Sequence, residues 1–100
     1  MELINDGEKY DELQQYLLKE LKEGISMRLH DAGLIGEKLQ EATDEVAFTV
    51  AAILDASQIM EHKGKDVFPY LAFQNPENED QLIHAGGNSW MHEYVFEWVA

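Results

Sequence analysis

Four histidines are the side chains of this chain best suited to acid–base chemistry or to metal binding: His30, His62, His84 and His92. No two of them have the spacing of a helical metal site such as HExxH. His84 and His92 flank a glycine-rich turn and could face each other across a hairpin. Glu93 or Asp80 would then supply a carboxylate for a divalent metal. Ordinary surface histidines account for the pattern more simply, so we expect no metal site and no cofactor.

Nucleophilic catalysis has little support in the sequence. The serines at positions 26, 57 and 89 lie outside any GxSxG elbow, and the chain has no cysteine. Gly86-Gly87 lacks the lysine and the length of a phosphate-binding loop. Carboxylates are numerous, but none is singled out by an apolar setting that would raise its pKa. We therefore expect a protein that is not an enzyme.

The charge balance is strongly acidic, with 20 acids against 7 bases and a formal net charge of −13. Nucleic-acid affinity depends on Lys and Arg, so direct binding of nucleic acid is disfavoured and a basic partner is favoured. A DNA mimic or an acidic inhibitor is an alternative, although lysines interrupt the acids of the N-terminal half. Size and acidity are similar to those of bacterial immunity proteins, antitoxins and phage-encoded inhibitors, a likeness of composition alone.

The final third of the chain combines aromatic side chains with acids and has no Lys or Arg after Lys65. Aromatic anchors inside an acidic rim are typical of a surface that docks a basic protein. We predict that the partner-binding residues are Phe68, Tyr70, Trp90, Tyr94, Phe96 and Trp98. The competing interpretation is that these aromatics form the core of a small sheet whose solvated edge carries the acids.

A rival from another functional class is a small-ligand or enzymatic domain. Its pocket would lie between helices and sheet and would be lined by Tyr70, His84, Trp90 and His92. A closed cavity with convergent polar groups would favour this rival, whereas a flat apolar patch would favour protein binding.

Two helices are predicted to form the N-terminal half of the chain. Apolar residues recur at helical spacing from Glu8 to about Ala32, and Asp6 is a suitable N-cap. A second helix is predicted from about Glu37 to Ala56. It contains the most apolar run of the chain, in which Val46, Val50, Ile53 and Leu54 form the predicted buried face. The short connection through Gly33, which suits the left-handed end of a helix, predicts an antiparallel helical hairpin.

The second half is rich in β-forming residues and turn signals. Short strands are predicted at Ile59–His62, Val67–Phe73 and Gln81–Ala85, separated by turns around Lys63–Asp66 and Asn75–Asp80. Trp90–Val99 is predicted as a strand, with a helix as the alternative. Met1–Gly7 is interpreted as an entry segment without regular structure.

These elements predict one α+β domain over residues 1–100, with two layers. An N-terminal antiparallel helical hairpin packs on a C-terminal antiparallel meander of three or four strands. The apolar run is too short to span a membrane, and the acidic N-terminal segment lacks an apolar signal core, which favours a cytoplasmic protein. The function that fits best is a small acidic protein-binding domain that forms a homodimer or docks a basic partner, without contact with membrane or nucleic acid.

Overall fold

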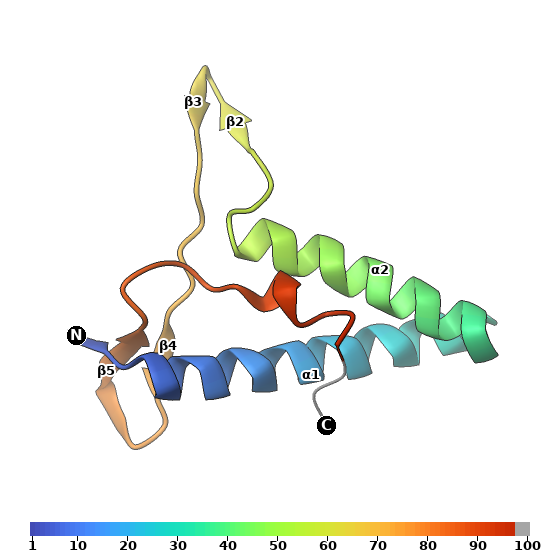
Figure 1. The fold of residues 1–100 in the computed structure, drawn as a ribbon, viewed down its shortest axis with the longest axis horizontal. Coiled ribbons are helices and arrows are strands. Elements are labelled where there is room, and N and C mark those ends of the chain that lie inside the picture. Colours follow the sequence, from blue (N-terminus) through green and yellow to red (C-terminus); the bar gives the residue numbers. More distant parts are fainter. Residues whose placement is uncertain (98–100) are drawn as a thin grey trace.

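In a computed structural model, which describes residues 1–97, two long helices carry most of the regular structure. The elements in chain order are β1 (Glu2–Asn5), α1 (Gly7–Asp31), α2 (Gly36–Leu54), β2 (Glu61–His62), β3 (Lys65–Asp66), β4 (Phe73–Asn75), β5 (Asn78–His84) and the 3₁₀ turn η1 (Met91–Glu93). The predicted α+β class is confirmed: a helical hairpin packs against a small, mostly antiparallel sheet (Figure 1).

Local signals set both ends of α1. The Asp6 carboxylate accepts a hydrogen bond from the Lys9 N–H at 3.1 Å, as expected of an N-cap. At the other end Gly33 adopts a φ of 104°. The N–H of Leu34 then donates to Leu29 O at 3.1 Å, which closes a Schellman motif. The chain reverses within a few residues, and α2 runs back along α1 as the predicted hairpin (Figure 1).

The helix α2 ends with the same motif but without a glycine. Ala56 occupies the left-handed position with a φ of 60°, and the Ser57 N–H donates to Ala52 O at 2.9 Å. A side chain with a Cβ is strained in this conformation by about 1 kcal/mol. This strained alanine directs the chain away from the helices as soon as α2 ends.

The main sheet has the order β1-β5-β4. β5 pairs with β4 in the antiparallel direction, and it contains most of the predicted strand Gln81–Ala85. β1 pairs with β5 in parallel, with Leu3 opposite Leu82. The interpretation of residues 1–7 as an irregular entry segment is therefore wrong. β1 escapes sequence analysis because it is four residues long and its partner lies almost at the other end of the chain.

The region between α2 and β4 differs from the predicted meander. β2 and β3 form a separate two-stranded ladder. The predicted strand Ile59–His62 shrinks to its last two residues, and its partner β3 lies within the predicted turn Lys63–Asp66. Residues 67–72 are extended but pair with no strand, and only Phe73 of the predicted strand Val67–Phe73 lies in a ladder. Pro69 in the middle of this segment has no N–H to donate to a ladder.

The prediction of a strand from Trp90 to Val99 is wrong for the residues that the structure describes. Met91–Glu93 form a 3₁₀ turn, and the Tyr94 N–H donates to Met91 O at 2.9 Å. Met91 and Val95, four residues apart, are both fully buried in the core with Leu18, Ala47 and Ala51. Side chains of a strand alternate between two faces, whereas a four-residue spacing on one face needs a helical backbone.

The buried face of α2 also differs from the prediction. Its buried residues are small, Thr43, Ala47, Ala51 and Ala52, whereas Val46 is 40% exposed. Met91 and Val95 of the C-terminal segment pack in the core with Ala47 and Ala51 of α2 and Leu18 of α1. Small side chains on α2 let these elements approach closely, and Figure 1 shows the C-terminal turn beside the two helices. Large aliphatic residues of α2 are consequently left partly at the surface. Among the described residues, neither helix is long and apolar enough to cross a membrane.

Replacing Ala56 with glycine should raise the free energy of unfolding by about 1 kcal/mol, because glycine adopts a positive φ without strain. Urea denaturation followed by circular dichroism measures the change. The matched control is Ala32→Gly, at the end of α1, where φ is −80° and glycine should bring no gain. Equal effects of the two substitutions would contradict the strain at Ala56.

Candidate protein-interaction site

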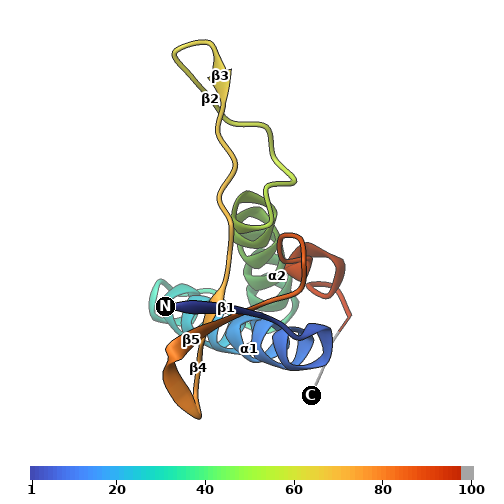
Figure 2. The same ribbon diagram turned by 90° about the vertical axis from the view of Figure 1, so that its left-hand side faces the viewer.

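A segment of the second half projects from the body of the molecule. We call residues 57–72 the arm; it contains β2, the turn at Lys63 and Gly64, β3, and residues 67–72, which belong to no strand. The Val67 N–H donates to Met60 O at 2.8 Å, one step beyond the β2–β3 ladder. Both turn residues have positive φ, 53° and 76°, which matches the type I′ turn of a tight hairpin. Two perpendicular views show the arm pointing away from the helices (Figures 1 and 2).

The base of the arm is fixed by side chains from distant parts of the chain. The Asn88 side chain accepts a hydrogen bond from the Leu71 N–H at 3.0 Å and donates to Pro69 O. The Tyr10 hydroxyl donates to Leu71 O at 2.8 Å. The Tyr70 hydroxyl lies 2.9 Å from Nδ1 of His84 on β5. Residues 69–71, where the chain returns from the arm to the body, are therefore held in a defined position.

Beyond this base, large apolar side chains of the arm are open to solvent. Ile59 is 80% exposed, Phe68 63% and Tyr70 54%, and Val67 is also exposed. The arm has two lysines and two acids, so its formal charge is zero and the rest of the chain carries the whole charge of −13. The arm is thus a projection with exposed apolar side chains and balanced charges, on an acidic body.

A second apolar patch lies where α2 meets the C-terminal turn. The rings of Phe48 and Phe96 are 5.5 Å apart, and Phe96 is 64% exposed. Phe48 also contacts the His92 ring edge-on, at 6.2 Å between ring centres. Val46, 40% exposed, lies two residues from Phe48 and therefore on a different side of α2, beside Leu21 and Ile25 of α1.

The six predicted partner-binding residues fall into different places. Phe68 and Tyr70 lie on the arm, Phe96 lies on the patch beside α2, and Trp98 lies outside the described residues. Trp90 and Tyr94 are built into the body. The Trp90 ring stacks on Tyr10 with 5.7 Å between ring centres, and its Nε1–H donates to the Tyr94 hydroxyl at 3.0 Å.

Trp90 and Tyr94 belong to a polar network that ties the C-terminal turn to α1. The Tyr94 hydroxyl donates to Asp11 Oδ1 at 2.9 Å, and the Trp90 N–H donates to Gln14 Oε1 at 2.9 Å. Gln14 is fully buried and its amide also donates to Asp11. These two aromatics have a structural role, although they contact α1 from the C-terminal turn and do not form the core of a sheet.

Sequence analysis missed Ile59 and Phe48 as exposed apolar residues. Ile59 falls in the predicted strand Ile59–His62, and Phe48 falls in the predicted second helix, outside its predicted buried face. A signal for Ile59 is the run of polar and charged residues that follows Met60, from Glu61 to Asp66, which is typical of a solvent-exposed turn. For Phe48 no sequence signal separates a buried ring from an exposed one.

The best-buried carboxylate of the molecule, Asp55, lies at the end of α2, where it has no exposed side-chain surface. It accepts a hydrogen bond from the Ser89 hydroxyl. It also accepts from the His92 N–H and pairs with His92 Nδ1, both at 2.7 Å. Asp55 therefore joins the end of α2 to the loop after β5 and to η1.

This cluster has the residue types of a Ser–His–Asp site but not its connectivity. The Ser57 hydroxyl lies 3.2 Å from His92 Nδ1, the same nitrogen that pairs with Asp55. A catalytic triad needs the serine and the acid on opposite nitrogens of the imidazole. Ser89 donates to Asp55 instead of contacting a histidine. The arrangement is that of a structural hydrogen-bond network.

The histidine pair considered from sequence is separated. His84 pairs with Tyr70 and accepts from the Gly86 N–H, whereas His92 pairs with Asp55. Within residues 1–97, no group of three or more histidines and carboxylates is placed to hold a metal ion. Of the predicted pocket, Tyr70 and His84 come together, and Trp90 and His92 lie against other partners.

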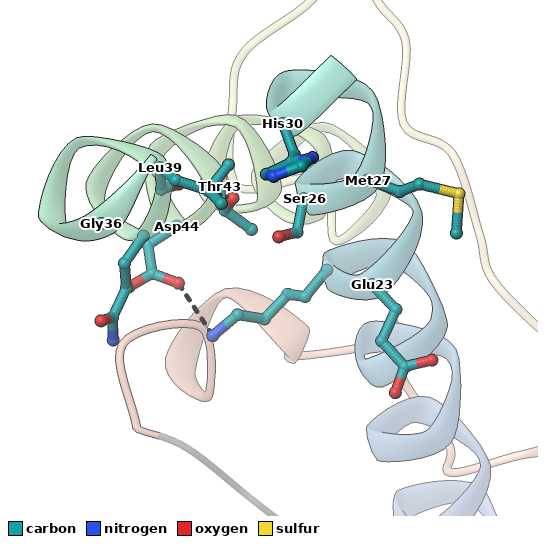
Figure 3. Close-up of a pocket in the computed structure, with 10 residues that line it drawn as sticks. Glu23, Ser26, Met27, His30, Gly36, Leu39, Thr43 and Asp44 are labelled. Atoms are coloured by element: carbon teal, nitrogen blue, oxygen red, sulfur yellow. Dashed lines mark hydrogen bonds and ion pairs between the residues drawn. The ribbon is translucent and has the colours of Figure 1, made fainter. Parts of the chain in front are cut away.

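A groove of about 580 Å³ lies instead between the two helices, where α1 ends and α2 begins. Its walls come from the last three turns of α1 and the first two turns of α2, and Figure 3 shows Ser26 and His30 of α1 facing Leu39 and Thr43 of α2. One rim carries Asp44, paired with Lys22 at 2.8 Å. We call this hollow the interhelical groove.

Replacing Asp55 with alanine should lower the free energy of unfolding by about 3 kcal/mol, because it leaves the buried donors of Ser89 and His92 without an acceptor. Urea denaturation gives the value, and a double-mutant cycle with Ser89→Ala should show coupling. Glu45→Ala, on the exposed side of α2, is the control and should change stability by less than about 0.5 kcal/mol. Equal losses at Asp55 and Glu45 would contradict the structural role of Asp55.

Two tyrosines make stability depend on alkaline pH. Burial raises the pKa of Tyr10, and burial likewise raises the pKa of Tyr94. In the unfolded chain tyrosine ionises near pH 10. Because the pKa values of the folded state are higher, the contribution of these tyrosines to the free energy of unfolding is complete below about pH 10. It is lost as pH rises through the pKa values of the folded state. Tyr10→Phe should therefore give a shallower loss of stability above pH 10, measured by urea denaturation at several pH values. An unchanged slope would contradict this, and Tyr16→Phe, at an exposed position, is the control.

Comparison with known proteins adds no relative to this description. No family model matches the chain, and no match is found among curated proteins or solved structures. The geometry of the arm, the patch beside α2 and the interhelical groove is therefore the basis on which a function is proposed.

Proposed function

We propose that this chain is a non-enzymatic protein-interaction domain that docks its partner through the arm. The observation that carries the proposal is the exposure of Ile59, Phe68 and Tyr70 on a projection that the rest of the chain does not cover. An isolated two-stranded hairpin is marginally stable in water, and exposed apolar patches of this kind mark interaction sites.

The anchoring of the base supports the proposal. Hydrogen bonds from Asn88 and Tyr10 hold Leu71, so the strand that returns from the tip is positioned before any partner arrives. A preorganised surface loses less conformational entropy on binding than a flexible one does. Phe68 and Tyr70, just outside this base, would act as the apolar anchors of the contact.

The charge distribution of this chain indicates which kind of partner surface would fit it. The acidic body would attract a protein with a basic rim, while the arm, which has no net charge, inserts its apolar side chains into an apolar surface. Self-association is the second form of the same proposal, since a homodimer is the commonest way to cover an exposed apolar face. Both forms depend on the arm.

A non-enzymatic role is supported by the chemistry available among the described residues. Asp55, His92 and Ser57 form the nearest approach to a catalytic group, and they converge on one imidazole nitrogen. The interhelical groove lies far along α2 from this cluster, since its lining from α2 ends at Asp44.

The test is a double substitution in the arm, Ile59→Ser with Phe68→Ser. We expect association to weaken by at least tenfold, which corresponds to about 1.4 kcal/mol. Stability should stay within about 0.5 kcal/mol of the original, because both side chains are exposed. Sedimentation velocity over a range of protein concentrations measures self-association, and immobilised protein measures retention of a foreign partner.

Tyr16→Ser is the matched control, because Tyr16 is 60% exposed on α1 and lies outside the arm. Association that survives the double substitution unchanged, or that is lost equally with Tyr16→Ser, would overturn the arm as the docking surface. Tyr94→Ala is unsuitable for this test, because Tyr94 holds the C-terminal turn on α1 and its loss would report folding.

A further inference from the structure

We infer that the partner of the arm is a second copy of this chain, and that each arm enters the interhelical groove of the other copy. The inference rests on the proposed function and identifies the surface that receives the arm. It is supported by the area that the chain leaves exposed, by the separation of charge between arm and body, and by the positions of arm and groove in the fold.

The exposed area is large for a chain of this size. The accessible surface is 6818 Å² for a mass of 11.5 kDa. A folded monomer of that mass is expected to expose about 5,800 Å². The surplus, about 1,000 Å², is close to the roughly 800 Å² that each partner contributes to an interface of standard size. The surplus is thus comparable to the area that each copy would cover in a stable dimer.

The charges allow two copies to meet by this route. Body against body would bring two strongly negative surfaces together, which costs free energy. The arm has no formal charge and presents Lys63 and Lys65 beside its turn. The carboxylates in the lining of the groove are Glu23 and Asp44, and Asp44 is already paired with Lys22. The groove lies between the C-terminal end of α1 and the N-terminal end of α2, whose helix dipoles have opposite signs there. The arm, with no net charge, therefore meets no strong opposing charge in the groove, and Glu23 is the carboxylate that we assign to its lysines.

The groove also offers apolar contacts. Met27, 62% exposed, and Leu39 belong to its lining, and Ser26 and Thr43 add short polar side chains between the helices (Figure 3). Its volume of about 580 Å³ is enough to take two or three large side chains from a partner. Ile59 and Phe68 are the side chains of the arm most open to solvent, and we assign them to this space.

An arm does not reach the groove of its own chain. The groove is formed where α2 begins, at Gly36 to Asp44, and the arm leaves from the other end of that helix. The base of the arm is held by Asn88 and Tyr10, and the arm points away from α2 (Figures 1 and 2). A second copy related by a two-fold axis would satisfy both contacts at once and close the assembly as a dimer.

The test uses the absence of native cysteine. Three single variants are prepared: Val67→Cys in the arm, Met27→Cys at the rim of the groove, and Tyr16→Cys elsewhere on α1 as the control. All three positions are exposed, so each variant should fold. Pairs of variants are mixed, treated with a short bismaleimide and resolved by denaturing electrophoresis and mass spectrometry.

We expect the mixture of Val67→Cys with Met27→Cys to give linked dimers at least about tenfold faster than the mixture of Val67→Cys with Tyr16→Cys, because contact raises the effective concentration of the two thiols. Rapid linking of Val67→Cys with itself would place the arms against each other and overturn the groove as the receiving site. Equal rates in both mixtures would overturn it as well.

The solution mass of the original chain separates failure of this inference from failure of the proposed function. A mass of one chain at all concentrations overturns the second copy as partner, while a foreign protein lost with the arm variant would still support docking through the arm. Met27→Glu should weaken the dimer at least tenfold, and Tyr16→Glu should leave it unchanged. A dimer that tolerates Met27→Glu as well as Tyr16→Glu would also overturn the inference.

Discussion

The structure depends on the buried carboxylate of Asp55. It lies where α2 ends, and it binds the hydroxyl of Ser89 and two nitrogens of His92. A carboxylate taken out of water needs several donors, and here they come from the loop after β5 and from η1. These contacts stabilise the C-terminal segment as the turn η1 beside the helices.

The position of η1 determines which side chains pack in the core beside the two helices. Met91 and Val95 take the place in the core that large side chains of α2 would otherwise occupy, and α2 meets them with Ala47 and Ala51. The large residues Val46 and Phe48 are then left at the surface, where Phe96 joins Phe48. The exposed apolar surface of α2 is therefore a consequence of how the core is packed: Met91 and Val95 are buried against the small residues of the helix, and its large residues remain outside.

The same cluster decides where the arm starts. The chain leaves α2 through Ala56 directly after Asp55, and Ser57 contacts the His92 ring. Asn88, next to Ser89, holds the returning strand at Pro69 and Leu71. The buried network and the base of the arm thus share one loop, so the proposed docking surface is positioned by the core of the domain.

Sequence alone determined the parts of this protein that depend on neighbouring residues. The Asp6 cap, the Gly33 termination, the helical period of both helices and the turn at Lys63-Gly64 all follow from interactions within a few positions. The class of the fold and the acidity follow from the same information.

Tertiary structure decided the rest: the parallel pairing of β1 with β5, the face of α2 that is buried, the turn at Met91, and which aromatics stay exposed. Trp90 and Phe68 both belong to the aromatic set predicted to bind a partner, yet the Trp90 N–H donates to Gln14 in the body and Phe68 faces solvent. Their fates differ because burial is set by contacts between residues that lie 30 to 80 positions apart, such as Asp55 with His92 and Leu3 with Leu82.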